Sequence, residues 1–295
     1  MKLVTYQSNG ATNVGALVGD QVIDLAAAHA AAGNSTAFPS DMIALLTAGE
    51  AGMAQASAAL AHAQQSGAHA TAADAVTFLP PVVRPGKVIA MGRNYAEHAK
   101  EGGAEVPEFP MWFHKTHTSL TGHQQPVIIP PGTSKVDYEG ELAIIIGKTC
   151  KFVSVEEALD YVAGYAVAND VSARDWQRRT TQFTAGKMVD TFGPLGPALV
   201  TKDEIADVQK LQLRTYLNGQ LMQDGNTKDM IFSVAVSIAD LARICTLEVG
   251  DVILTGTPEG VGFARKPPVF MKEGDVVSVE IEGLGTLTNP LKNYQ

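Results

Sequence analysis

Short runs of β-forming residues, each bounded by glycine or proline, fill the chain from residue 87 onward and restrict its fold more than any other feature. Helical periodicity occurs at only two places in this region, residues 155–161 and 227–244. Many short strands with few helices favour a β-sandwich, roll or barrel whose loops carry the functional residues. Strands are expected at residues 87–91, 127–129, 141–147, 164–169, 198–201, 211–217, 251–255, 276–281 and 285–289.

Three prolines, at positions 80, 81 and 85, separate this β-rich body from the first part of the chain. Because proline blocks both a helix and a central strand, we predict a small α+β domain at 1–80 and a catalytic domain at 86–295. The first 80 residues contain 23 alanines. Here we expect strands at 1–6 and 14–22, the second with a hairpin turn at Gly19-Asp20, a short helix capped by Asp24, and a longer helix at 41–65.

The composition excludes several classes of protein. With 45% hydrophobic residues, a chain of 295 can bury a large core and is not disordered. A formal charge of −9 with scattered lysine and arginine argues against nucleic-acid binding. No run approaches the ~18 apolar residues of a membrane span. Because the N-terminus lacks a signal-peptide pattern and only two cysteines are present, we expect a cytoplasmic protein.

Carboxylates gather at the start of an apolar strand. Glu139 and Glu141 alternate along the chain, so they point to the same face just before the apolar run 142–146. Such a pair is usually a solvated strand face, but Asp170 also follows an apolar strand, 164–169. Like charges held this close favour a bound cation. Three oxygen ligands without histidine or cysteine would select Mg²⁺ or Mn²⁺, with Ca²⁺ as a further option.

A histidine and a glutamate stand three residues apart at His98 and Glu101, between strand 87–91 and the β-rich body. On one helical turn the two side chains would share a face and could hydrogen-bond. A carboxylate that orients an imidazole makes a general base, although most such pairs are surface contacts. The adjacent Gly102-Gly103 would suit a loop that moves over a site, or a plain turn.

Taken in order, five motifs resemble the fumarylacetoacetate hydrolase family. The resemblance covers about residues 87–290, roughly two thirds of the chain, and the first 80 residues match only the variable N-terminal domain of many members. The motifs are Gly-Arg-Asn-Tyr-x-x-His-x-x-Glu (92–101), Asp-Tyr-Glu-Gly-Glu-Leu (137–142), Ala-Asn-Asp-Val-Ser-Ala-Arg-Asp-Trp-Gln (168–177), Gly-Lys-x-x-Asp-Thr-Phe-Gly-Pro-Leu-Gly-Pro (186–197) and Leu-Thr-Gly-Thr-Pro-Glu-Gly-Val-Gly (254–262).

The resemblance implies a mixed β-sandwich roll, mostly β with some α, that usually forms a homodimer. It also implies roles for single residues. Those roles are metal ligands for Glu139, Glu141 and Asp170, a water-activating pair on a mobile lid for His98 and Glu101, ligand binding and charge stabilisation for Lys187, pocket-wall positions for Gln177 and Thr257, and a place in the lid motif for Arg93.

The chain departs from the family's founding enzyme at one metal ligand. The fourth carboxylate, expected seven residues before His98, is replaced by Met91. Smaller acylpyruvate-cleaving members share this absence, so the chain looks closer to them, with water in place of the fourth protein ligand.

The chemistry that these residues favour is metal-dependent hydrolysis of a carbon–carbon bond in a 2,4-diketo acid, of the kind met in catabolism of aromatic compounds or sugar acids. His98 would activate water, and the metal and Lys187 would stabilise the pyruvate enolate that leaves. The alternative is decarboxylation or tautomerisation of a β-keto acid such as oxaloacetate, which needs the same enolate but no water. A non-catalytic scaffold would lack the His–Glu pair or the lysine.

For the other polar residues that we considered, surface, interface or structural roles are the main expectation. Arg174, Arg178 and Arg179 could contact an anionic substrate, but surface or interface charges are the stronger expectation. His114, His117 and His123 are expected to be structural, because a carboxylate metal site needs no imidazole.

Overall fold

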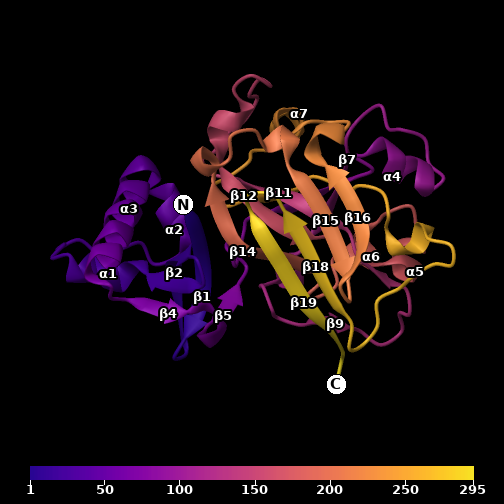
Figure 1. Cartoon of the computed structure of the whole chain (residues 1–295). Coiled ribbons are helices and arrows are strands. Elements are labelled where there is room, and N and C mark those ends of the chain that lie inside the picture. Colours follow the sequence, from indigo (N-terminus) through magenta and orange to yellow (C-terminus); the bar gives the residue numbers. More distant parts are fainter.

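One large sheet runs from the N-terminal part of the chain into the catalytic body (Figure 1). The computed structural model describes residues 1–295. This sheet has 12 strands, two of them beside the main path: β5 (Thr77–Leu79) pairs with β1, and β8 (Leu120–Thr121) with β14. The main order is β4 (Ala70–Ala72), β3 (Gln21–Asp24), β2 (Ala11–Val18), β1 (Lys2–Ser8), β14 (Gly193–Thr201), β12 (Val162–Asn169), β11 (Gly140–Ile146), β17 (Val252–Leu254), β6 (Val88–Gly92) and β7 (Met111–Lys115).

A second sheet of five strands packs over the catalytic part of the first. Its order is β16 (Gln220–Asn226), β15 (Gln212–Leu217), β18 (Val276–Ile281), β19 (Gly285–Asn293) and β9 (Val127–Ile129). A two-stranded pair, β10 (Val136–Asp137) and β13 (Ser172–Ala173), lies apart from both. Each sheet order ends in edge strands, so the sheets are open and the expected sandwich is confirmed, whereas a closed barrel is not formed.

Strand β11 shows how the sequence divides the core into two. Leu142, Ile144 and Ile146 belong to the hydrophobic cluster that includes strands of the second sheet. The alternate residues Ala143 and Ile145 belong to a cluster shared with β1 and the N-terminal helices. Since side chains alternate along a strand, a run that is apolar at every position fits a strand buried on both faces.

The N-terminal helices confirm one prediction and correct another. Asp24 caps α1 (Leu25–Ala31) as expected, its carboxylate accepting from Ala27 N. The single helix expected at 41–65 is wrong: the structure has α2 (Met42–Thr47) and α3 (Gly49–Ser66), divided where Gly49 adopts a φ of 58°. The remaining helices are α4 (Ala96–Glu101), α5 (Arg174–Gln177), α6 (Thr184–Lys187) and α7 (Val234–Ile244).

Helical periodicity at 155–161 and 227–244 also predicted more helix than forms. The first stretch contains only a 3₁₀ turn, Ala158–Tyr161, and the second begins with a 3₁₀ turn, Thr227–Asp229, before α7. The α7 helix starts later because Ser233 caps it by accepting from Val236 N. None of the helices combines the length and the apolar content that a membrane crossing requires.

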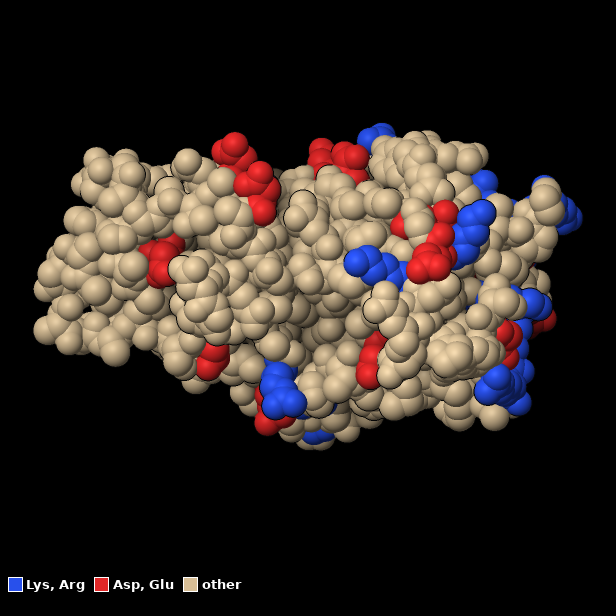
Figure 2. All heavy atoms as spheres, turned by 90° about the horizontal axis from the view of Figure 1, so that it is seen from below, with Lys and Arg blue, Asp and Glu red and all other residues tan.

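The N-terminal part shares its core with the catalytic body. Leu3 on β1 is fully buried and pairs with Leu199 on β14. Both belong to the cluster that also holds Leu25 and Leu45 from the N-terminal helices. Figure 2 shows mainly uncharged side chains over this end of the molecule, in keeping with its alanine content.

Shortening Leu3 to alanine tests this shared core. We expect Leu3→Ala to lower the free energy of unfolding by about 2–5 kcal/mol, because it leaves a cavity among fully buried neighbours. Urea denaturation followed by fluorescence and circular dichroism would measure it. Val18→Ala, at a residue 38% exposed, serves as the control and should cost far less. An equal loss in the two variants would contradict the shared core.

Candidate active site

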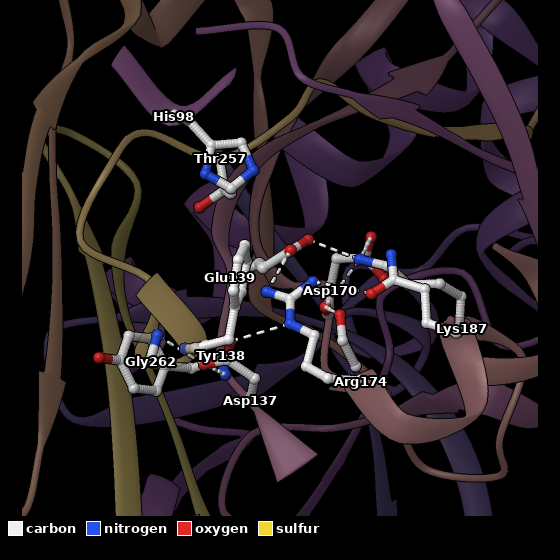
Figure 3. A network of polar contacts seen from close by, with 12 residues as sticks. His98, Asp137, Tyr138, Glu139, Asp170, Arg174, Lys187, Thr257 and Gly262 are labelled. Atoms are coloured by element: carbon white, nitrogen blue, oxygen red, sulfur yellow. Dashed lines mark hydrogen bonds and ion pairs between the residues drawn. The ribbon is translucent and has the colours of Figure 1, made fainter. Parts of the chain in front are cut away.

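A cavity of about 280 Å³ opens at the ends of the central strands of the large sheet. Its wall is built from β6, α4, β7, β11, α5 and α6 and from the loop that follows β17. Segments far apart in the sequence therefore meet here, and their polar side chains converge (Figure 3). The functional candidates among the lining residues are Arg93, His98, Glu139, Glu141, Arg174, Gln177, Arg178, Lys187 and Thr257.

Three carboxylates lie at the base of this region. Glu139, Glu141 and Asp170 each offer one oxygen within 4.8 Å of the others, and all three are buried. The pairing of β11 with β12 explains the arrangement, because Gly140 lies opposite Asn169 and Asp170 N donates to Glu139 O at 2.8 Å. The two glutamates of the Glu-x-Glu pair and the aspartate that follows the neighbouring strand therefore lie close together.

Buried cations surround two of the three carboxylates. Lys187 Nζ lies 2.5 Å from Glu139 Oε2 and 2.6 Å from Asp170 Oδ2. Arg174 Nη2 lies 2.7 Å from Glu139 Oε1. Burial by itself would raise the pKa of Glu139, but the charges of Lys187 and Arg174 overcome this effect and lower it to about 2. Glu139 is therefore ionised.

Glu141 has no such partner. Its Oε2 accepts from Gly256 N at 2.7 Å, and no ion pair reaches it. Burial raises the pKa of Glu141 well above its ordinary value, and the charges of Asp170 and Glu139 raise it further. Glu141 is a buried carboxylate with one backbone donor and two acidic neighbours. A bound hard cation would neutralise this unfavourable negative charge. The three residues therefore fit a divalent metal ion.

The predicted acid–base pair lies on α4, and Figure 3 shows His98 above Glu139. His98 Nδ1 lies 2.9 Å from Glu101 Oε1, and His98 is 9% exposed. The other oxygen of Glu101 accepts from Gly260 N at 2.9 Å, which ties the helix to the loop after β17. Asn94, fully buried, fixes the start of the segment by donating to Phe232 O and Thr255 O. The imidazole is thus held by the hydrogen bond between Nδ1 and Glu101, and Nε2 has no hydrogen-bond partner within the chain.

The other predicted residues also line the cavity. Arg93 adopts a φ of 58° and stacks on Phe183, with 5.9 Å from its guanidinium carbon to the ring centre. Gln177 Oε1 accepts from Arg174 Nη1 at 3.1 Å. Thr257 is 2% exposed, and its hydroxyl donates to Gly140 O at 2.8 Å.

For Arg174 the expected surface or interface role is wrong. It is 4% exposed, its Nε donates to Asp137 Oδ2 at 2.9 Å, and its guanidinium stacks on Phe263 at 4.5 Å. Asp137, fully buried, also accepts from Gly262 N at 2.7 Å and Phe263 N at 3.0 Å. Arg178, although exposed, lines the cavity as well. Asp137 and Arg174 both lie in motifs shared with the family, 137–142 and 168–177, but no pattern within either motif indicates that the two side chains pair.

Lys115 is a buried cation of the site that the sequence did not predict. It comes from β7, is 3% exposed, and its Nζ donates to Asp170 Oδ1 at 2.7 Å and to the carbonyl of Lys187. Burial lowers its pKa, the charge of Asp170 opposes this, and the charge of Lys187 lowers it further. Nothing in the polar segment around residue 115 indicated a buried strand.

Comparisons with known proteins agree with this geometry. The family model "Fumarylacetoacetate (FAA) hydrolase C-terminal" matches residues 87–292. An oxaloacetate tautomerase of Xenopus laevis (fahd2, mitochondrial) is 43% identical over 297 residues, covering 99% of this chain and 90% of that protein. Human FAHD2A, also named a mitochondrial oxaloacetate tautomerase, is 50% identical over 216 residues, covering 72% and 69%.

Solved structures show the same architecture. The crystal structure of maleylpyruvate hydrolase from Sphingobium sp. SYK-6, in complex with manganese(II) ion and pyruvate, matches with a TM-score of 0.80 and 32% identity. The match covers 100% of both chains. The expected fold is confirmed over the whole chain, N-terminal part included.

Proposed function

Because the chain belongs to the fumarylacetoacetate hydrolase family, we propose that this enzyme interconverts the keto and enol forms of oxaloacetate. The relatives that are 43% and 50% identical carry that activity in their names. This favours the alternative raised from the sequence over the hydrolysis first expected. The observation that carries the proposal is the oriented His98–Glu101 pair beside a small, cation-lined cavity.

The cations suit a dicarboxylate. Arg93, Arg174, Arg178 and Lys187 all line the cavity. Arg174 is engaged by Asp137 and Glu139, whereas Arg93 and Arg178 make no ion pair within the chain and are available to a ligand. A volume of about 280 Å³ is enough for a four-carbon acid. Guanidinium groups are the preferred partners of carboxylates, because they offer parallel N–H donors.

Tautomerisation needs only the movement of a proton. Glu101 engages His98 Nδ1, so Nε2 is free to take a proton from C3 of the keto acid. The electrons of that C–H bond form the C2=C3 double bond, and the C2 oxygen receives a proton. No water is consumed and no fragment leaves, so one base that takes a proton at carbon and returns it at oxygen is sufficient.

Glu139, Glu141 and Asp170 would hold Mg²⁺ or Mn²⁺ in this reaction. When bound, such an ion supplies Lewis-acid chemistry to an oxygen of the substrate. Lys187 stays protonated, because burial would lower its pKa but the charges of Asp170 and Glu139 raise it. It can therefore stabilise negative charge that develops on the substrate oxygen.

Hydrolysis of an acylpyruvate is the second candidate. It is favoured by the similarity to maleylpyruvate hydrolase and by the same His98–Glu101 pair, which could activate water. A homodimer and a cytoplasmic location remain predictions from the sequence.

Product analysis separates these activities. We expect purified protein with Mn²⁺ to speed the loss of enol absorbance of oxaloacetate by at least about 100-fold, without release of pyruvate or CO₂. Fumarylpyruvate would be tested in parallel. Release of pyruvate and fumarate from it would support the hydrolase, pyruvate with CO₂ from oxaloacetate would indicate decarboxylation, and no turnover of either acid would refute both candidates.

A further inference from the structure

A closed ring of buried hydrogen bonds connects Gln223, Thr257 and Gly140. Gly140 N donates to Gln223 Oε1 at 3.0 Å, Gln223 Nε2 donates to Thr257 Oγ1 at 2.7 Å, and Thr257 Oγ1 donates to Gly140 O at 2.8 Å. Gln223 Nε2 also donates to Pro258 O at 2.8 Å. Gln223 is 1% exposed and comes from β16 in the second sheet. It lies behind the cavity wall and does not line it.

The backbone fixes the direction of every bond in this ring. Gly140 N can only donate, so it must meet the oxygen of the Gln223 amide. Pro258 O can only accept, so it must meet the nitrogen. The amide orientation follows without ambiguity, and Thr257 Oγ1 therefore accepts from Nε2. Since Gly140 O can only accept, the hydroxyl proton of Thr257 points to it.

A hydroxyl group has one proton and two lone pairs. In Thr257 the proton and one lone pair are used within the ring, and one lone pair of this residue, which lines the cavity, has no partner. We infer that Gln223 is a positioning residue which makes Thr257 a pure hydrogen-bond acceptor, so that the bound ligand must present an O–H donor there. Neither Thr257 nor Gln223 can then donate a hydrogen bond to a ligand carboxylate or a keto oxygen, because these groups are acceptors themselves.

This inference rests on the proposed function, which it narrows. The keto and enol forms of oxaloacetate differ in one hydroxyl, and an acceptor-only Thr257 would favour the form that carries it. In the hydrolytic reading the same lone pair would receive a proton of the attacking water. Both sources share the chemistry of an O–H donor, and the two assays described above distinguish them.

A double-mutant cycle tests whether Gln223 acts through Thr257. We expect Thr257→Val, which removes the acceptor at constant size, to lower kcat/KM about 10-fold, and Thr257→Ser to recover most of that loss. Gln223→Met, which releases the hydroxyl, should also lower kcat/KM about 10-fold, yet have no further effect in the Thr257→Val background. Gln220→Leu, at an exposed position on the same strand, is the control and should leave the rate unchanged.

Metal affinity provides a readout that does not depend on turnover. Because Gly140 lies between Glu139 and Glu141, loss of the ring could simply disturb those two ligands. We expect Thr257→Val and Gln223→Met to change the Kd for Mn²⁺ by less than about threefold, since the Glu139 backbone is also held by Asn169 Oδ1 at 2.9 Å. A loss of Mn²⁺ affinity of more than 10-fold in both variants would show that Gln223 acts by holding the metal ligands in place. That result would overturn the inference.

The remaining outcomes are decisive too. A loss confined to oxaloacetate assigns the donor to the enol hydroxyl, and a loss confined to fumarylpyruvate assigns it to water. Multiplicative losses in the double variant, or full activity of Thr257→Val, refute the acceptor role. If Gln223→Met fails to fold, the comparison of Thr257→Val with Thr257→Ser still decides it. A wild-type enzyme inactive on oxaloacetate would refute the proposed function alone, because the same ratios can be read from fumarylpyruvate.

Discussion

His98→Gln should lower kcat by about 10²–10⁴-fold, the range that general acid–base groups contribute. Glutamine keeps a polar side chain of similar reach but has no nitrogen that takes up a proton near neutral pH. The substitution therefore removes the proton transfer and leaves the cavity otherwise intact. Steady-state kinetics with oxaloacetate and Mn²⁺ would measure the loss.

Metal binding separates this chemical role from a structural one. His98 is not among the carboxylate cluster, so His98→Gln should bind Mn²⁺ with the wild-type Kd. His62→Gln, on α3 outside the cavity, is the matched control and should keep full activity. A His98→Gln enzyme with the wild-type kcat would show that another group moves the proton.

Glu141→Gln should weaken Mn²⁺ binding by more than about 100-fold and abolish measurable turnover at micromolar metal. Loss of groups that only support a metal ligand costs about 10–100-fold, and loss of the ligand itself should exceed that range. A chelator should inactivate the wild-type enzyme in the same way, and added Mn²⁺ or Mg²⁺ should restore it. Isothermal titration calorimetry and kinetics would measure both effects.

The same variant should gain stability when no metal is present. Burial and the charges of Asp170 and Glu139 disfavour the ionised form of Glu141, as its raised pKa shows. Glutamine keeps an oxygen for Gly256 N but carries no charge, so the Tm of the metal-free variant should exceed that of metal-free wild type. Glu50→Gln, exposed on α3, should change neither Tm nor metal affinity. Unaltered Mn²⁺ binding by Glu141→Gln would rule out the proposed ligand set.

The carboxylate cluster could be predicted because it depends on local rules. Alternation along a strand places Glu139 and Glu141 on one face, and Asp170 is the residue after the neighbouring strand. The nine strands expected after residue 86 are all confirmed, with shifts of a few residues at their ends. Some of these strands, such as β11 with its apolar run 142–146, are buried on both faces, whereas others, such as β15, alternate between buried and half-exposed residues, and both patterns are local.

The missed features depend on contacts between distant parts of the chain. Strand β16 has the sequence Gln-Leu-Met-Gln-Asp-Gly-Asn, which is too polar to be recognised, yet it carries Gln223. Lys115 and Arg174 are charged, and charged residues are buried only where partners neutralise them. Those partners, Asp170 and Asp137, lie 55 and 37 residues away, so no local pattern could indicate the burial.

The pairing of β1 with β14 has a consequence for how such a chain could be shortened. The family match begins at residue 87, so the N-terminal part looks dispensable for chemistry. Yet Leu199 and Val200 on β14 pair with β1, and removal of β1 would leave them on an uncovered sheet edge. Unprotected edges recruit strands from other molecules and lead to aggregation. We therefore expect a chain shortened to residues 87–295 to aggregate through the uncovered edge of β14.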